Sequence, residues 1–501
     1  MNVSSDIKIL DCTIRDGGYY TNWDFDKDLV QKYCEYLNSL PVEYIEIGYR
    51  SQEKKDEYFG EYFYLPLSTV KEIKKYTDKK LSIMLNAKDN NSDLDILLSD
   101  IKDYISLVRI ATDPNKIEFS IQLAQQIKKL GFEVAINVMY ISNIDKNHIF
   151  FDHLDNIGKY LDTLNLVDSY GSIYPEELDS LIKRVQKKTN ITLGFHGHNN
   201  IELAFSNSIK AIECGVEYID STILGMGRGA GNLKTELIFA YIKSKKNIEV
   251  DLNSLGRLTE LFGPLQTKYK WGANLAYMVA GCYSLPQRNV MDALAIERYS
   301  LSGIVNQLKN DGEIRLPVFE ADKNIESCLI IGGGNSVEEH IEAIKEYLSL
   351  NAQILIIYAT SKYIKLFEDI ENTQYFSVVG DELLKLNSFL HVNKYILEPS
   401  PRKVNNYIED KTNFYELEKI NFINKHIDSP LSVSLQITLD IKVQNIYLVG
   451  FDGYSELKNK KELYLMQENQ EIIDSFLSQQ ELVSLTSTKY KNLKKRSVYG
   501  I

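Results

Sequence analysis

The sequence predicts two α/β domains: an N-terminal (β/α)₈ barrel with appended helices, and a C-terminal domain built on an open sheet. The chain has 501 residues, more than one hydrophobic core usually holds. From residue 7 to about 246, short apolar runs alternate with segments of helical periodicity. The same alternation starts again at residue 327, after a stretch without clear periodicity. These observations favour parallel sheets with crossover helices in both parts of the chain.

The first domain, which we place at residues 1–250, contains eight expected strands, a number that favours a closed barrel over an open sheet. The strands are expected at residues 7–10, 42–47, 81–85, 105–110, 134–138, 163–167, 192–195 and 217–220. Amphipathic stretches follow most of them, at residues 26–40, 114–130, 175–188 and 200–214. Pro114 and Pro175 open two of these stretches, because the first turn of a helix tolerates proline. The acidic segment 92–103 is the weakest of the expected helices.

Residues 251–318 are expected to form an appended helical segment with an aromatic and small-residue cluster from Tyr269 to Asn274. Periodicity lapses around Arg315–Asn324, and we place the domain boundary there. The C-terminal domain, residues 325–501, is expected to be a Rossmann-like open sheet. Its strands are expected at residues 327–331, 353–358, 375–379, 393–397 and 445–449, and its helices at 337–349 and near 431–442.

Composition excludes several classes of protein. The net charge of −12 argues against nucleic-acid or anionic-membrane binding, although a local arginine can still bind an anionic substrate. The five cysteines are scattered without CxxC spacing, so we expect reduced thiols in a cytoplasmic protein. No signal peptide is evident at the start, and no run of about 18 apolar residues predicts a membrane span. We expect a homo-oligomer.

A divalent-metal site is indicated by one carboxylate and two histidines far apart in the sequence. Asp16 is expected in the loop after the first strand, and His196 and His198 at the end of the strand at 192–195. Their i,i+2 spacing points both rings to one side of an extended chain. A carboxylate with two neutral imidazoles leaves open positions on an ion, which suits Mn²⁺ or Mg²⁺, with Zn²⁺ as a further option. An HxH pair alone is more often chance, so the argument depends on the paired motifs.

Polar residues interrupt several other strand ends, where parallel strands of a barrel gather their functional groups. They are Glu46, Arg109, Asn137, Asp168 and Ser169. Buried charges are costly unless they are paired, so we expect these side chains to meet in one polar pocket. The alternative is that Glu46 and Arg109 form a structural ion pair, which is compatible with a supporting role.

The glycine-rich run Gly225–Asn232 follows the eighth strand and is expected to open a helix beside the other strand ends. It is a candidate active-site loop, with Arg228 as a substrate-binding residue and Asn232 as a fourth metal ligand. The alternative is a glycine loop without a ligand.

Together these motifs resemble the metal-dependent DRE-TIM superfamily, which includes lyases and synthases related to HMG-CoA lyase. The resemblance rests on Asp11-x-Thr13-x-Arg15-Asp16-Gly17, His196-Gly197-His198-Asn199 and Gly229-Ala230-Gly231-Asn232, and covers residues 7–300. The sequence of residues 193–208 is most similar to the 4-hydroxy-2-oxovalerate aldolase branch.

The resemblance implies metal ligation by Asp16, His196 and His198, with Asn232 matching an additional ligand of the lyase branch. It also implies that Arg15 stabilises an enolate or the carbonyl oxygen of the substrate. Further roles are implied for Asp168 and Ser169, lining a 2-oxo-acid pocket, and for Glu46 beside the site.

The sequence departs from the aldolase branch directly after this first motif. The aldolase has an acid–base histidine there, whereas this chain has Gly18, Tyr19 and Tyr20. The proton carrier is then Tyr19, Tyr20 or a metal-bound water. Alternatively, a tyrosine at this place is a stacking surface for a sugar-like substrate.

The C-terminal domain carries a glycine-rich turn, Gly332-Gly333-Gly334-Asn335-Ser336, after its first strand. With Asp452 at a later strand end, it resembles Rossmann-like domains of bacterial surface-glycan glycosyltransferases, and the resemblance implies a nucleotide-sugar pocket. A structural tight turn, or a partner-docking module without a ligand, are the alternatives.

The main hypothesis is therefore a metal-dependent aldolase or lyase acting through the enolate of a pyruvate-type 2-oxo acid. Its second substrate is an aldehyde or sugar-like molecule, and its expected role is the synthesis of an unusual surface sugar. A Claisen-type acyl-CoA synthase ranks second, since no CoA-binding signature is evident. A non-catalytic scaffold is the third hypothesis.

Overall fold

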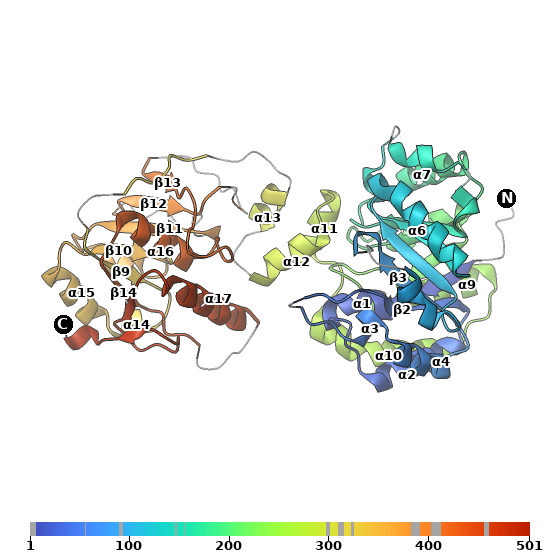
Figure 1. Ribbon diagram of the computed structural model, residues 1–501, viewed down its shortest axis with the longest axis horizontal. Coiled ribbons are helices and arrows are strands. Elements are labelled where there is room, and N and C mark those ends of the chain that lie inside the picture. Colours follow the sequence, from blue (N-terminus) through green and yellow to red (C-terminus); the bar gives the residue numbers. More distant parts are fainter. Residues whose placement is uncertain are drawn as a thin grey trace. The chain divides into compact units, whose positions relative to one another are not determined.

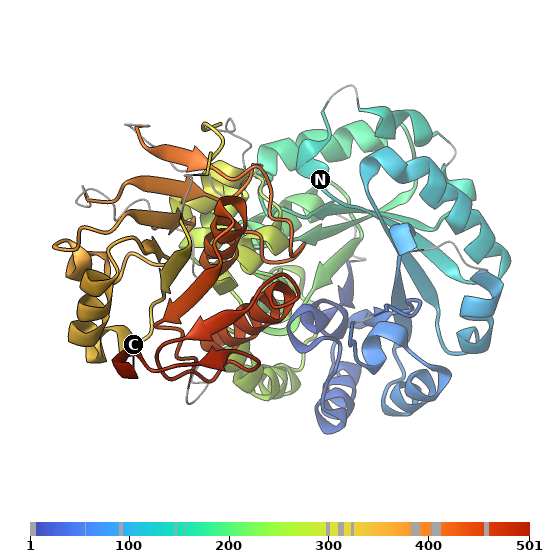
Figure 2. The ribbon, with the colours of Figure 1, turned by 60° about the vertical axis from the view of Figure 1, so that its left-hand side comes forward.

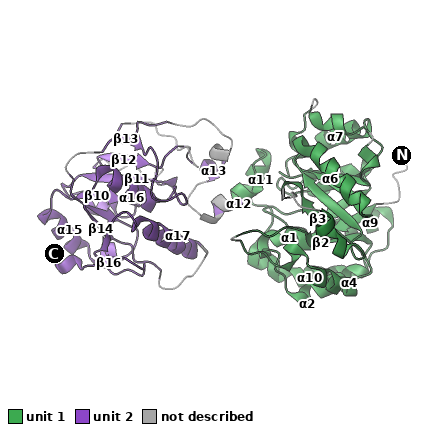
Figure 3. Cartoon of the chain, viewed as in Figure 1, with its two compact units in different colours: residues 1–290 green, residues 291–501 purple. Residues whose placement is uncertain are grey.

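The computed structural model describes residues 7–55, 57–89, 94–145, 148–155, 157–296, 301–308, 315–321, 325–380, 382, 391–400, 402, 412–454 and 460–500. The chain divides into two compact units, Met1–Val290 and Met291–Ile501 (Figure 3). The finer division at residues 250 and 318 stays a prediction. Parts of the expected helical segment and boundary, residues 297–300, 309–314 and 322–324, lie outside the described residues. Within the described part of the chain, no helix has the length and apolar character to cross a membrane.

The first unit is a closed barrel of eight parallel strands, as the sequence predicts (Figures 1 and 2). The strands are β1 (Lys8–Asp11), β2 (Val42–Tyr49), β3 (Lys80–Asn86), β4 (Leu107–Thr112), β5 (Glu133–Val138), β6 (Thr163–Asp168), β7 (Thr192–Gly197) and β8 (Tyr218–Ser221). Each strand pairs with the next in the chain, and β1 pairs with β8 to close the ring. All eight strands therefore end at one face of the barrel.

Helices surround the barrel, and several of them bury one apolar stripe against it. In α7, for example, the buried side chains Leu178, Leu181, Ile182 and Val185 follow the i, i+3, i+4, i+7 spacing of one helix face. The helices are α1 (Thr13–Thr21), α2 (Lys27–Asn38), α3 (Glu61–Tyr64), α4 (Leu67–Tyr76), α5 (Leu94–Leu98), α6 (Ile117–Lys129), α7 (Pro175–Gln186), α8 (Ala204–Glu213), α9 (Thr235–Lys246), α10 (Leu252–Tyr269), α11 (Leu275–Cys282) and α12 (Gln287–Ile296). Short 3₁₀ turns are η1 (Ala87–Asp89), η2 (Ser99–Ile101), η3 (Pro114–Lys116), η4 (Ile141–Asn143), η5 (Ile149–His153), η6 (Ile157–Lys159) and η7 (Ile223–Gly225).

The second unit is built on an open, fully parallel sheet of eight strands, which confirms the expected open-sheet architecture. From one edge to the other the order is β13 (Phe414–Glu416), β12 (Lys394–Leu397), β11 (Gln374–Val378), β10 (Leu355–Tyr358), β9 (Ser327–Ile331), β14 (Asn445–Val449), β15 (Leu482–Ser484) and β16 (Lys494–Lys495). The chain order runs outward in opposite directions from β9 and β14. Between these two strands lies the point at which such sheets bind ligands.

Both faces of this sheet are covered, as the alternation of β9 side chains shows. Cys328 and Ile330 belong to the core shared with α16 (Pro430–Ile441) and α17 (Lys460–Phe476). Leu329 and Ile331 belong to the opposite core, with α15 (Ile341–Leu350). The remaining elements of the unit are α13 (Leu301–Leu308), α14 (Ser336–Glu339), η8 (Ile364–Phe367) and η10 (Val498–Gly500).

Candidate functional site

Asp16 lies on a helix, not in the loop that the sequence analysis expected. Helix α1 follows β1 almost directly, because the Asp11 carboxylate accepts hydrogen bonds from the backbone N–H of Thr13 at 2.9 Å and from its hydroxyl. The Tyr33 hydroxyl holds the same carboxylate at 2.6 Å. This early turn places Arg15 and Asp16 in the first turn of α1, buried at the carboxyl end of β1.

Two buried imidazoles reach the same place from the end of β7. The Nδ1 atom of His196 lies 3.0 Å from Oδ2 of Asp220, and Nδ1 of His198 lies 2.8 Å from the carbonyl oxygen of Asp168. Because both partners are acceptors, we assign the ring proton of each histidine to Nδ1. Each Nε2 atom therefore keeps its lone pair, which is the arrangement found when histidine ligates a metal.

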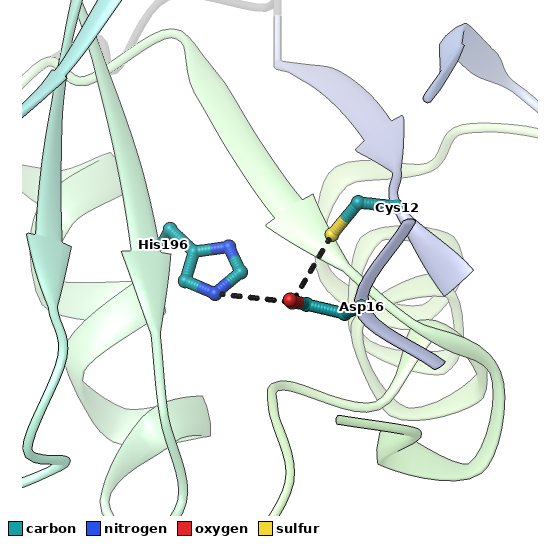
Figure 4. A group of neighbouring side chains, drawn as sticks. All are labelled: Cys12, Asp16 and His196. Carbon is teal, nitrogen blue, oxygen red and sulfur yellow. Dashed lines mark hydrogen bonds and ion pairs between the residues drawn. The ribbon is translucent and has the colours of Figure 1, made fainter. Parts of the chain in front are cut away.

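The side chains of Asp16 and His196 point toward one another (Figure 4), and Asn232 contacts the same carboxylate. Nε2 of His196 lies 3.5 Å from Oδ2 of Asp16, and Nδ2 of Asn232 donates to the same oxygen at 2.6 Å. The ring of His198 lies 5.0 Å from that of His196. Oδ1 of Asn232 is buried and meets no hydrogen-bond partner among the described residues. The structure thus brings Asp16, His196 and Asn232 together, and His198 lies beside His196.

The charge states of Asp16 and His198 are suited to binding a cation. Burial and the neighbouring His196 lower the pKa of His198 to about 3, so its imidazole is neutral at physiological pH. Burial opposes ionisation of Asp16, but Arg15 and the two histidines outweigh it and lower the pKa of Asp16. The Asp16 carboxylate, the imidazoles of His196 and His198 and the spare amide oxygen of Asn232 form a donor set that fits a divalent ion.

Cys12 is a neighbour of this group that the sequence analysis did not single out. Its Sγ atom lies 3.9 Å from Oδ2 of Asp16, and Cys12, Asp16 and His196 form a compact cluster (Figure 4). Burial raises the pKa of the Cys12 thiol well above its usual value. A metal ligand must be the thiolate, and this shift opposes its formation while no ion is bound.

A buried network of charged side chains contacts the candidate metal ligands and holds them in position. Nε of Arg15 donates to Glu46 at 2.7 Å and its Nη1 contacts Asp16. Nη1 of Arg109 donates to the other oxygen of Glu46 at 3.2 Å, and its Nη2 contacts Asp220. Glu46 and Arg109 are both fully buried. The structural ion pair that the sequence left open is therefore present, and direct catalytic or substrate roles for these two residues stay predictions.

Asn137, Asp168 and Ser169 shape the surroundings of the centre. Oδ1 of Asn137 accepts from Nε of Arg109 at 3.1 Å. The Asp168 carboxylate accepts the backbone N–H groups of Ser172 and Ile173 at 3.1 and 3.2 Å, and Oγ of Ser169 accepts the N–H of Tyr140 at 3.0 Å. These bonds fix the turn after β6 and the carbonyl that holds His198. Contact of these residues with a substrate stays a prediction.

The two tyrosines that follow the first motif, Tyr19 and Tyr20, lie with Tyr49 in a group that we call the aromatic wall. The hydroxyls of Tyr19 and Tyr49 lie 3.0 Å apart, and the Arg228 guanidinium lies 4.3 Å from the centre of the Tyr19 ring. The Tyr20 hydroxyl donates to the carbonyl of Gly229 at 3.4 Å. Nε of Arg228 is buried and has no hydrogen-bond partner within the described part of the chain. The wall thus presents a cation and a pair of hydroxyls near Asp16.

Sequence reasoning missed Asp220 and Tyr49. Asp220 interrupts the apolar run of β8 in the way that Glu46 interrupts β2, so the same criterion would have found it. Tyr49 carried no such signal, because a tyrosine at a strand end is common in any barrel core.

Gly332–Ser336 and Asp452, suggested as nucleotide-binding residues, lie in the second unit. The structure brings them together: the Ser336 N–H donates to Oδ2 of Asp452 at 2.9 Å.

Comparison with known proteins yields one family and several relatives. The family model described as HMGL-like matches residues 6–262. An oxaloacetate decarboxylase of Mycobacterium tuberculosis is 27% identical over 261 residues, covering 49% of this chain and 73% of that protein. A 4-hydroxy-2-oxovalerate aldolase of Geobacillus thermodenitrificans is 28% identical over 248 residues, covering 48% of this chain and 71% of that protein.

Two solved structures are also similar to this chain. The N-terminal domain of a provisionally assigned aldolase from Bacteroides vulgatus is 46% identical, with a TM-score of 0.58, and covers 60% of this chain and 100% of that chain. The carboxyl transferase domain of Rhizobium etli pyruvate carboxylase, solved with pyruvate and biocytin, has a TM-score of 0.51 at 13% identity and covers 61% of this chain and 56% of that chain. This last likeness concerns the fold alone.

Proposed function

The chain belongs to the HMGL-like family, and from that premise we propose that its barrel breaks or forms a carbon–carbon bond beside the carbonyl of a 2-oxo acid, with a divalent metal as cofactor. The observation that carries this proposal is the convergence of Asp16, His196 and Asn232, with His198 beside them, at the carboxyl ends of the barrel strands. The family supports a lyase, and the choice of an aldolase of pyruvate type is our proposal.

The relatives named above suggest one common chemistry. Oxaloacetate and 4-hydroxy-2-oxovalerate are both 2-oxo acids. When the C3–C4 bond of either breaks, its electron pair enters C2–C3 and gives the enolate of pyruvate, which then takes a proton at C3. The other fragment leaves as carbon dioxide from the former and as an aldehyde from the latter. We propose the same bond cleavage, or its reverse, for this chain.

Asp16, His196, His198 and Asn232 would hold the ion, for which Mn²⁺ or Mg²⁺ is favoured and Zn²⁺ is a further option. The bound ion supplies a Lewis acid for the 2-oxo group. Arg15 adds a fixed positive charge where negative charge develops on the substrate. Glu46 holds Arg15 in place through the 2.7 Å contact, and Asp220 orients His196.

We propose Tyr19 as the proton carrier that replaces the histidine of the aldolase branch. An aldol cleavage must remove the proton of the C4 hydroxyl. A tyrosine can accept this proton as the phenolate, which a neighbouring cation stabilises, and can return it as the phenol. Tyr19 has the Arg228 guanidinium against its ring and the Tyr49 hydroxyl at 3.0 Å. Tyr20 is less suited, because burial raises its pKa and its hydroxyl already donates to Gly229.

Arg228 is proposed to bind an anionic group of the substrate. Its Nε–H is buried without a partner among the described residues, and it lies in the loop that also carries Asn232. A carboxylate would supply the missing acceptor. The aromatic wall of Tyr19 and Tyr20 also suits a sugar-like second substrate, which supports a role in making an unusual surface sugar.

The test is to incubate the metal-loaded full-length protein with oxaloacetate and with 4-hydroxy-2-oxo acids of different length. We expect release of pyruvate from at least one of them and no consumption of acetyl-CoA. Consumption of acetyl-CoA with a 2-oxo acid would instead identify a Claisen-type synthase. Absence of turnover with every substrate would favour the non-catalytic scaffold.

A further inference from the structure

The second unit contains a cavity of about 1080 Å³ at the carboxyl ends of its strands. Its wall is formed by residues that follow five strands, β9, β10, β11, β14 and β15, together with the start of α16 and part of α17. The cavity therefore spans the gap between β9 and β14, where the strand order reverses. In open parallel sheets this is the place where ligands bind, and the volume suits a nucleotide-sized molecule.

The glycine turn on this wall contains one glycine that folding does not require. A Cβ atom at Gly332 would lie 2.6 Å from the carbonyl oxygen of Gly450, and one at Gly334 would lie 2.4 Å from Oδ2 of Asp452. At Gly333 the nearest atom would be 3.7 Å away, and the backbone is not in the left-handed region. Gly333 is exposed on the cavity wall. A glycine without a structural reason marks a place where a ligand approaches the backbone closely.

The N-terminus of α16 provides an anion site on the same cavity. Ser429, its N-cap residue, is 1% exposed and lines the cavity. Its hydroxyl neither caps the helix nor meets any other partner in the described residues. Pro430 has no N–H, so the first turn of this twelve-residue helix offers the N–H groups of Leu431 and Ser432, and a helix N-terminus favours negative charge.

The neighbouring helix α14 does not offer such a site. Its first residue, Ser336, donates both its N–H and its hydroxyl to the carboxylate of Asp452. An anion placed there would meet that carboxylate. The N-terminus of α16 is thus better suited than that of α14 to the anionic part of a ligand.

The charged residues that line the cavity limit the classes of ligand that can bind there. Lys461 and Lys489 can meet phosphate oxygens, whereas Glu339, Glu382, Asp452 and Glu468 give the wall more carboxylates than ammonium groups. Carboxylates accept hydrogen bonds from sugar hydroxyls but repel a highly charged triphosphate. A ligand that matches both features has one or two phosphates and a hydroxyl-bearing sugar.

We propose that this cavity binds a nucleoside mono- or diphosphate, with its phosphate at the N-terminus of α16 and against Gly333. The proposal is independent of the chemistry of the barrel. The sugar hydroxyls of the ligand would donate hydrogen bonds to the carboxylates of the cavity wall. Any substrate that is covalently linked to the nucleotide would thereby be held by this unit.

The test is calorimetric titration of the full-length protein with CMP, UMP, GMP, UDP, GDP and inorganic phosphate, and of the variants Gly333→Leu and Gly158→Leu. Gly158 is the matched control, because it is also exposed and a Cβ atom there meets nothing within 4 Å, but it lies in the barrel unit. We expect one nucleotide to bind in a 1:1 ratio. Gly333→Leu should weaken it by about tenfold or more, the effect of losing hydrogen bonds to a charged group, and Gly158→Leu should not.

Pyruvate release by the barrel should be unchanged in Gly333→Leu, which separates this test from that of the proposed function. If Gly333→Leu loses its cooperative thermal transition, Ser429→Ala takes its place, with a several-fold loss of affinity expected. The proposal is overturned if no nucleotide binds, if phosphate binds as tightly as the nucleotides, or if the substituted glycine or serine leaves affinity unchanged.

Discussion

Nδ1 of His196 lies 3.0 Å from Oδ2 of Asp220, and this contact sets which nitrogen of the ring faces Asp16. Asp220 also contacts Arg109. Burial alone would raise the pKa of Asp220, but the positive charge of Arg109 and the contact with His196 outweigh this effect and lower the pKa to about 2. The carboxylate is therefore ionised at all physiological pH values. It orients the imidazole and increases its basicity, as acceptors behind metal-ligating histidines generally do.

Replacing Asp220 by asparagine should weaken metal binding by about 10- to 100-fold, because the amide is a poorer acceptor for the His196 N–H. Titration of the metal-stripped protein with Mn²⁺ measures this. Asp162→Asn is the control, since Asp162 pairs with Lys128 in an exposed ion pair. Unchanged affinity in Asp220→Asn would argue against the assigned orientation of His196.

His196→Ala should abolish both metal content and turnover, because it removes one donor from the group formed with Asp16. Elemental analysis of the purified variant and the pyruvate-release assay measure the two effects. His153→Ala, a partly exposed histidine in η5, should behave like the unmodified protein. Full turnover of His196→Ala without metal would refute the metal site.

Glu46→Gln should lower the free energy of unfolding of the first unit by about 3–5 kcal/mol, since it removes one of the two carboxylates that pair with each of the buried Arg15 and Arg109. Urea unfolding followed by tryptophan fluorescence reports this unit alone, because both tryptophans, Trp23 and Trp271, lie in it. Glu43→Gln, on the same strand but in a partly exposed pair with Lys80, should cost less than about 1 kcal/mol. Equal effects would contradict the network.

Arg228→Gln should raise the KM for the 2-oxo acid by about tenfold or more and leave kcat nearly unchanged, if Arg228 binds the substrate anion in the ground state and the transition state alike. Steady-state kinetics separate the two parameters. Arg257→Gln is the control, because Arg257 also stacks on a tyrosine, Tyr36, but on α10. A fall in kcat alone would assign Arg228 to the transition state instead.

Tyr19→Phe should reduce aldol turnover by about 10²- to 10⁴-fold, the usual contribution of a positioned proton carrier. Tyr20→Phe keeps the ring and loses only the bond to Gly229, so it should have a much smaller effect. The pH profiles of kcat for both variants measure the difference. Little or no loss in both variants would indicate that only the rings are needed, as a stacking surface.

The barrel could be predicted from the sequence because its signal is repeated. Each of the eight strands is an apolar run buried on both faces, and the intervening helices keep a 3.6-residue stripe, as in α7. The expected position of Asp16 in a loop was wrong for a local reason. The hydrogen bonds of Thr13 to Asp11 start α1 at once, and no periodicity in eight residues can reveal that.

The second unit was predicted less fully. The short strands β13, β15 and β16, at or next to the sheet edges, have two or three residues each and give no apolar run long enough to recognise. Helix α17 was missed although it has 17 residues, since its sequence mixes charged and apolar residues with little separation of faces. The open N-terminus of α16 depends on a side-chain rotamer of Ser429, which sequence cannot give.

The central claim is that a divalent ion at Asp16, His196, His198 and Asn232 lets this protein form the enolate of a 2-oxo acid. Its most direct test is the incorporation of deuterium into C3 of pyruvate in D₂O, followed by mass spectrometry, before and after removal of metal. The account predicts exchange that stops on chelation and returns with Mn²⁺ or Mg²⁺. Exchange that persists without any ion, or that no ion can elicit, would contradict it.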